Sequence, residues 1–119
     1  MAIFSLKNQE EFDIVSKHGV KRHGSCLILV LATNFTYIIS PARSPTFFGM
    51  KVSRKLSKKA VIRNKVKRRI RHLVRHIVKD PNIDTGNTAF IIIPKKDFNK
   101  VRFVKLIADF YSTFAKILS

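Results

Sequence analysis

The chain has 119 residues, of which 45% are hydrophobic, and it carries 24 lysines and arginines against 7 acidic residues, a formal net charge of +17. The apolar content excludes a wholly disordered chain, and the length fits one domain with its own core. Such a charge destabilises a compact chain by self-repulsion, which predicts a polyanionic partner. There is no basic leader and no apolar run long enough to span a membrane, so we expect a cytoplasmic protein with no membrane partner.

The first half of the chain is predicted to hold one helix and three strands. Asn8 followed by Glu11 has the pattern of a capping box, and Gly19 is a natural helix stop, so we expect a helix at Gln9–His18. Three strands are predicted next from apolar, branched segments separated by turn residues: Ser25–Leu31, Phe35–Ile39 and Thr46–Ser53.

The second half opens on a segment that is both basic and amphipathic. Between Lys51 and Lys79 there are 13 basic residues and no acid. Apolar residues recur there every three or four positions within an arc of about 80°, which predicts a helix at Ala60–Val78. A fourth strand is expected at Thr88–Ile93 and a last helix at Asn99–Leu118. The order αβββαβα predicts a single-domain α+β sandwich, a four-stranded sheet with helices packed on it.

On a helical wheel the basic helix divides into three surfaces. The apolar arc would face the sheet, with residues Ile62, Val66, Ile70, Leu73 and Ile77. A basic flank lies beside it, formed by Arg63, Asn64, Lys67, Arg68, Arg71 and Arg75. The remaining side forms a basic fringe of Lys65, Arg69, His72 and His76. Like charges spaced i,i+4 cost a few tenths of a kcal/mol each, so we expect the basic flank to meet phosphates.

The chemistry of the basic flank suits RNA. Arginine grips phosphate with two parallel hydrogen bonds and stacks on bases, while Asn64 can both donate and accept at a base edge, a 2′-hydroxyl or a metal-bound water. Helices that read DNA usually belong to all-helical motifs, zippers or zinc fingers, whereas a sheet with a helical edge suits RNA recognition.

The sequence offers no convincing catalytic centre and no sign of a small-molecule substrate. It lacks a Walker loop and a Gly-x-Ser-x-Gly turn. His72 and His76 have the spacing of two zinc ligands, but without an evident third ligand we expect them to join the basic fringe. The only cysteine, Cys26, excludes an internal disulfide and lies in an apolar run, so a buried, inert thiol is expected.

The segment from Lys59 to Arg71 resembles the protein subunit of bacterial ribonuclease P. That family carries the motif Arg-Asn-x-x-Lys-Arg-x-x-Arg after Ala-Val, matched here by Arg63, Asn64, Lys67, Arg68 and Arg71. The resemblance runs from about Ser5 to Leu118, since the Lys-His-Gly at the end of the first helix, the Lys-Val-Ser-Arg-Lys before the motif and the Phe-Ile-Ile-Ile-Pro strand also agree. It implies the αβββαβα fold with a left-handed crossover.

The resemblance also implies a function. The chain would bind the catalytic RNA and the 5′ leader of precursor tRNA, and would assist Mg²⁺-dependent removal of that leader. The catalytic groups and most of the Mg²⁺ contacts would belong to the RNA. The implied RNA-binding residues are Arg54, Lys55, Lys59, Arg63, Asn64, Lys67, Arg68, Arg71 and Arg75, and Phe12 and His18 would line the leader cleft.

The sequence departs from the family pattern at the cleft. Ser16 stands where the family often has a second aromatic residue, and the first predicted strand is aliphatic. Tyr37, Phe47 and Phe48 are the aromatic candidates to compensate, although we favour core packing for them. Two other functional classes stay open from the residues alone: a structural RNA-binding protein, such as a ribosomal one, and a stand-alone nuclease.

Overall fold

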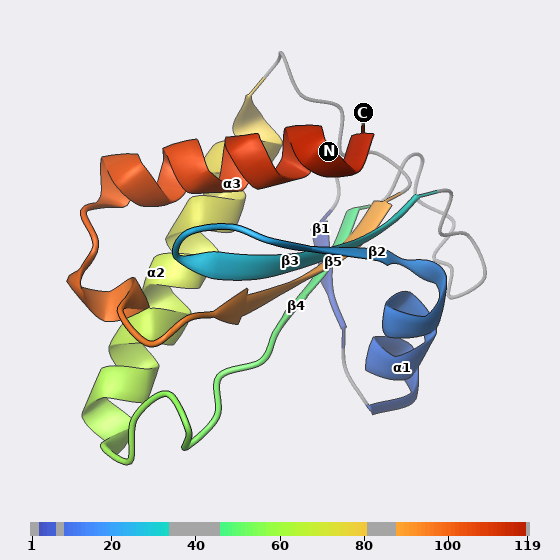
Figure 1. Ribbon diagram of the computed structural model, residues 1–119. Coiled ribbons are helices and arrows are strands. Elements are labelled where there is room, and N and C mark those ends of the chain that lie inside the picture. Colours follow the sequence, from blue (N-terminus) through green and yellow to red (C-terminus); the bar gives the residue numbers. More distant parts are fainter. Residues whose placement is uncertain (1–2, 7–8, 34–45, 81–87, 119) are drawn as a thin grey trace.

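The computed structural model describes residues 3–6, 9–33, 46–80 and 88–118, and within them the chain forms one mixed sheet with helices on both faces (Figure 1). The strands are β1 (Ile3–Ser5), β2 (Val20–His23), β3 (Leu27–Thr33), β4 (Thr46–Met50) and β5 (Thr88–Pro94). The helices are α1 (Gln9–His18), α2 (Ala60–Lys79) and α3 (Phe103–Leu118), with a short 3-10 helix, η1 (Phe98–Lys100), before α3.

The sheet has the strand order β1-β4-β5-β3-β2. β4 lies parallel to both β1 and β5, whereas β3 runs antiparallel to β5 and β2. Because β4 and β5 are parallel neighbours, the chain must cross over between them, and α2 forms that crossover. The left-handed sense of the crossover stays an expectation from the resemblance.

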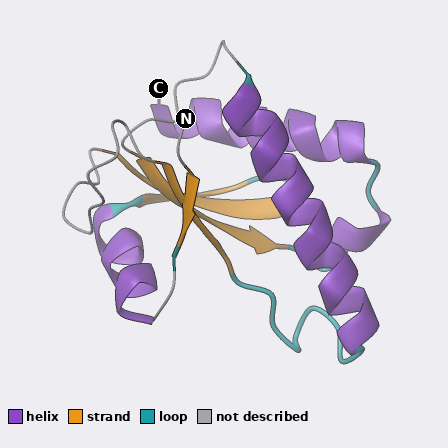
Figure 2. Ribbon diagram, turned by 180° about the vertical axis from the view of Figure 1, so that it is seen from behind, coloured by secondary structure: helices purple, strands orange, loops and turns teal. Residues whose placement is uncertain are grey.

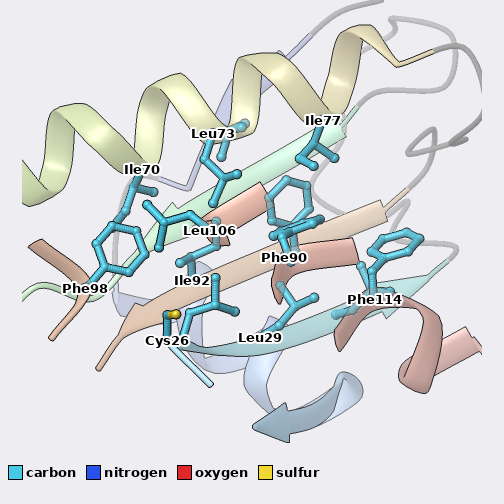
Figure 3. Packing of buried hydrophobic residues seen from close by; sticks show 14 of the residues in the cluster. Cys26, Leu29, Ile70, Leu73, Ile77, Phe90, Ile92, Phe98, Leu106 and Phe114 are labelled. Carbon is cyan, nitrogen blue, oxygen red and sulfur yellow. The ribbon is translucent and has the colours of Figure 1, made fainter. Parts of the chain in front are cut away.

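Each face of the sheet has its own hydrophobic core. On one face α2 and α3 pack against β3 and β5, so that Ile70, Leu73 and Ile77 point toward Phe90 and Ile92 (Figures 2 and 3). On the other face, α1 packs through residues that include Val15, against a smaller cluster of Leu6, Val30, Ala32, Phe47, Ala89 and Ile91. Strands covered on both faces are apolar throughout, which explains the continuous apolar runs in the sequence.

The predicted α+β class is confirmed. Within the described residues the order αβββαβα follows an additional first strand, β1, but its three consecutive strands begin with β2, which was not predicted. The described sheet has five strands rather than the four expected, because β1 and β2 had no clear sequence signal. β1 has three residues, and all four residues of β2 are exposed. The predicted strand Phe35–Ile39 lies outside the described residues.

The helix predictions agree closely with the structure. α1 has the predicted bounds and α2 ends one residue later than expected. α3 begins four residues later than predicted, because Phe98–Lys100 forms η1 instead. Cys26 is buried, as predicted, with a side chain 6% exposed. Burial, with the nearby Asp109 carboxylate as a smaller cause, raises the pKa of the Cys26 thiol.

Candidate RNA-binding surface

α2 is fixed by its apolar face rather than by a favourable N-terminal end. Lys59 stands at its N-cap without a side-chain hydrogen bond, and no acidic residue lies in the first turn. Its buried residues are Val66, Ile70, Leu73, Val74, Ile77 and Val78. Burying an aliphatic side chain stabilises a fold by roughly 1.5–3 kcal/mol, so this face compensates for the repulsion among the helix's cations.

The basic flank of α2 is presented to solvent as predicted. Asn64, Arg68, Arg71 and Arg75 are exposed, and Lys67 is half-buried. Four of the five motif residues line one open hollow of about 500 Å³, together with Val61, whose side chain is 67% exposed: Asn64, Lys67, Arg68 and Arg71. The hollow combines cations, one amide and one aliphatic surface, which suits a phosphate backbone and the bases attached to it.

Arg63, the fifth motif residue, faces a neighbouring surface. Its Nη1 donates hydrogen bonds to the carbonyl oxygens of Ser57 (2.9 Å) and Lys58 (3.0 Å), and so fastens the loop before α2 to the helix. The half-buried Arg63 lines a second hollow with Arg54, Lys55 and Lys58. The predicted residues Arg54 and Lys55 therefore adjoin the basic flank through Arg63. Lys59, also predicted, is exposed.

A groove runs along the edge of the sheet between α1 and α2. Its first part, about 310 Å³, is lined by Ser5, Leu6, Phe12, Phe48, Gly49, Met50, Lys67 and Arg71. An adjoining part of about 300 Å³ shares Ser5, Phe48 and Arg71 and adds Val74 and Arg75. We call these two parts the edge groove. It brings the ring of Phe12, on α1, together with Lys67 and Arg71, on α2. The two helices lie on opposite faces of the sheet (Figure 1).

The edge groove can bind a single-stranded polyanion. None of the residues that line it is acidic, and Lys67, Arg71 and Arg75 supply positive charge along one wall. Phe12 and Phe48 are half-buried, so each offers part of a ring to the groove. Aromatic rings beside a basic wall are the combination that single-stranded nucleic acid requires.

Comparison with known proteins places this arrangement in a family. The family model for ribonuclease P matches residues 3–118. The chain belongs to the ribonuclease P protein family. It is 54% identical over 106 residues to the ribonuclease P protein component of Rickettsia akari (strain Hartford), covering 89% of this chain and 90% of the relative. It is 53% identical, with the same coverage, to that of Rickettsia peacockii (strain Rustic).

Solved structures of ribonuclease P proteins share the fold. The Staphylococcus aureus protein at 2.0 Å superposes with a TM-score of 0.71 and 22% identity, covering 97% of each chain. The Thermotoga maritima protein gives a TM-score of 0.69 and 23% identity, covering 91% of this chain and 92% of its own. Together with the family match, these comparisons support the interpretation as a ribonuclease P protein and give no support to the ribosomal alternative.

The other residues implied by the ribonuclease P resemblance are placed as follows. His18 is exposed at the end of α1, about 120° around the helix from Phe12, and is not among the residues that line the edge groove. Its role in leader binding stays a prediction. Phe47 is 4% exposed and lies in the core, in agreement with the core packing that we favoured. Phe48 both packs against the core and lines the edge groove. Tyr37 lies outside the described residues.

The place given to Arg69 in the basic fringe is wrong. Its Nη1 donates to the carbonyl oxygens of Phe98 (2.8 Å) and Asn99 (3.0 Å), and its Nη2 donates to that of Val101. The guanidinium also lies 6.0 Å from the centre of the Phe98 ring. Arg69 therefore fastens η1 to α2, and the sequence could not show this because its acceptors are backbone atoms some thirty residues away.

The two histidines of the basic fringe are exposed but not isolated. The rings of His72 and His76 meet Phe103 edge-on, with centroids 4.7 Å and 6.4 Å from its own. Nowhere in the described part of the chain do three or more His, Cys, Asp or Glu side chains converge as a metal site would require. Among the helices described, not one has both the length and the apolar character to cross a bilayer.

Proposed function

We propose that this chain is the protein component of ribonuclease P and acts as an electrostatic and positioning subunit. The basic flank of α2, which includes Arg63, binds the catalytic RNA, and Arg54, Lys55 and Lys59 extend the contact. The edge groove holds the 5′ leader of precursor tRNA. The RNA subunit cleaves the leader and provides most of the ligands for Mg²⁺. Family membership and the groove that joins Phe12 to the motif helix support this assignment.

The contribution to catalysis follows from the charges. Two RNAs that approach each other repel through their phosphates, and cations placed between them lower that repulsion. Lys67 and Arg71 line both the edge groove and the hollow on the basic flank, so they lie where the two RNAs would come together. A subunit that screens this repulsion lowers the Mg²⁺ concentration that cleavage needs, and one that holds the leader lowers the entropic cost of positioning the substrate.

Reconstitution tests this function. At low Mg²⁺ we expect little cleavage of precursor tRNA by the protein alone or by its cognate RNA subunit alone, and efficient cleavage by the two together. Failure of the protein to stimulate the RNA would overturn the proposal. Cleavage by metal-supplied protein without RNA would favour a stand-alone nuclease.

A matched pair of variants links the stimulation to the proposed surface. Arg71→Ala should raise the Mg²⁺ concentration required for half-maximal cleavage, because it removes a cation from both hollows. Arg102→Ala removes the same charge from an exposed position just before α3 and should leave that requirement unchanged. Equal effects of the two variants would show that only net charge matters.

A further inference from the structure

Gly49 lies directly beneath the ring of Phe12. A Cβ atom at Gly49 would lie 2.6 Å from both Cε1 and Cζ of Phe12, and 3.0 Å from Cδ1 of Leu6. Real Cβ atoms do not approach other atoms this closely, so any larger residue forces a neighbour to move. Space, and not a left-handed backbone conformation, is what requires glycine here, because the φ angle of Gly49 lies outside that region.

The position of Gly49 in β4 explains why the Phe12 ring can come so near. β1 ends at Ser5, opposite Phe48, and beyond this point β4 pairs with β5 alone. Phe48 and Met50 belong to the core on the α2 and α3 face, so by alternation Gly49 points to the α1 face. Without a side chain there, the ring of Phe12 lies against the β4 backbone at the open edge of the sheet.

The Phe12 ring is held from a second direction by a lysine. Lys51, the first residue after β4, places its Nζ 5.9 Å from the ring centre. A cation at this distance is attracted to the face of an aromatic ring. The ring is therefore set between Gly49, Leu6 and Lys51, while its remaining surface lines the edge groove with Lys67 and Arg71.

We propose that Gly49 is a positioning residue for substrate binding: it sets the depth and tilt of the Phe12 ring so that a leader base can stack on it while Lys67 and Arg71 hold the adjoining phosphates. This inference rests on the proposed function, since it concerns the same groove. Gly49 itself touches no RNA and acts only through Phe12. A methyl group at position 49 moves the ring toward the groove and closes the space for the base.

The test compares substrates with and without a leader. Kd is measured for the reconstituted holoenzyme with precursor tRNA and with mature tRNA. Loss of one stacked base weakens binding by roughly fivefold or more, and we expect this for Phe12→Ala on precursor tRNA only. Gly49→Ala should approach the same loss on precursor tRNA and leave the Kd for mature tRNA, and that for the RNA subunit, unchanged.

Gly24 provides the matched control. A Cβ at Gly24 would be equally crowded, 2.5 Å from Oγ1 of Thr113 and 2.6 Å from Oδ2 of Asp109, but Gly24 follows β2, at the opposite edge of the sheet from the groove. Gly24→Ala is expected to lower the melting temperature without changing the ratio of the two Kd values. If Gly24→Ala and Gly49→Ala change that ratio equally, the effect is general destabilisation and the proposal is wrong.

A double variant separates positioning from packing. Phe12→Ala removes the two closest contacts of a Cβ at Gly49 and leaves Cδ1 of Leu6, at 3.0 Å, as the nearest atom. Leu6 Cδ1 is the far end of a flexible side chain, so adding Gly49→Ala should cost no further precursor affinity. This double variant also covers the case in which Gly49→Ala alone does not fold, because it should fold and bind as Phe12→Ala does. A further loss of precursor affinity in the double variant would contradict the proposal. Failure of the wild-type protein to stimulate the RNA would instead refute the proposed function itself.

Discussion

Arg68 and Arg69 are neighbours in sequence and have different tasks. Arg68 is exposed and lines the hollow on the basic flank. Arg69 instead donates hydrogen bonds to three backbone carbonyls in and just after η1. One step along a helix turns a side chain by 100°, which is enough to move an arginine from the exposed basic flank to a half-buried position against η1. Residue type and net charge alone do not reveal this difference.

The two arginines should therefore differ in how much stability is lost when each is replaced by lysine, which keeps the charge. Arg69→Lys keeps the charge but loses the planar fork that serves three carbonyls. We expect it to lower the free energy of unfolding by about 1–3 kcal/mol, measured by urea denaturation. Arg68→Lys, the matched control, should change stability by less than about 0.5 kcal/mol. Equal stability of the Arg69→Lys and wild-type proteins would show that those hydrogen bonds contribute little.

At the scale of elements, a polar contact joins the end of α2 to α3. The hydroxyl of Tyr111 donates a hydrogen bond to Oδ2 of Asp80, at 2.5 Å, where Asp80 follows the last residue of α2. Burial, reinforced by this hydrogen bond and by the charge of Asp80, raises the pKa of Tyr111 to about 12. The contact needs the protonated hydroxyl, so it ties the packing of the two helices to pH.

The sign of this pH dependence follows from the pKa in each state. An unfolded tyrosine ionises near pH 10, whereas folded Tyr111 keeps its proton until about pH 12. The stabilisation is therefore complete below pH 10 and is lost as pH rises toward 12. Unfolding measured across this range should show a fall in stability that is smaller in Tyr111→Phe. Lysines also ionise in this pH range, but they do so in both proteins, so the comparison isolates Tyr111. Parallel curves of stability against pH for the two proteins would contradict the prediction.

Elements with a strong local pattern could be predicted, and those held by distant partners could not. The apolar rows of α2 and β5 reveal both elements, because their residues face the cores. β1 exists through its parallel pairing with β4, more than forty residues away, and β2 is an exposed edge strand. The spacing and charge of the helix predicted the basic flank, but the packing of Phe12 on Gly49 depends on a contact across the fold.

The whole molecule separates its charge from its cores. α2 carries no acid along its length, and its cations lie outside an interior of apolar side chains. Phosphates bound by these cations release counterions, so binding weakens as salt increases. The molecule therefore combines an ordinary hydrophobic core with a basic surface whose affinity for phosphates should depend on ionic strength.

Salt titration of the complex with the RNA subunit measures this property. If ~6–8 phosphates are neutralised, a plot of log K against log salt should have a slope of about −4 to −7. Arg68→Ala should make the slope shallower by about 1 if Arg68 binds one phosphate. Arg102→Ala, which removes an equal charge outside the basic flank, should leave the slope unchanged. An unaltered slope in Arg68→Ala would remove this residue from the interface.

The burial of Cys26 has a practical consequence. It is the only cysteine of the chain, and both its low exposure and the raised pKa of its thiol suppress the thiolate that alkylating reagents attack. A second cysteine introduced at exposed Ser16, one turn from Phe12 on α1, would therefore react selectively with a fluorophore in the otherwise native background. A fluorophore could thus be placed one turn from Phe12, near the edge groove, without first replacing the native cysteine.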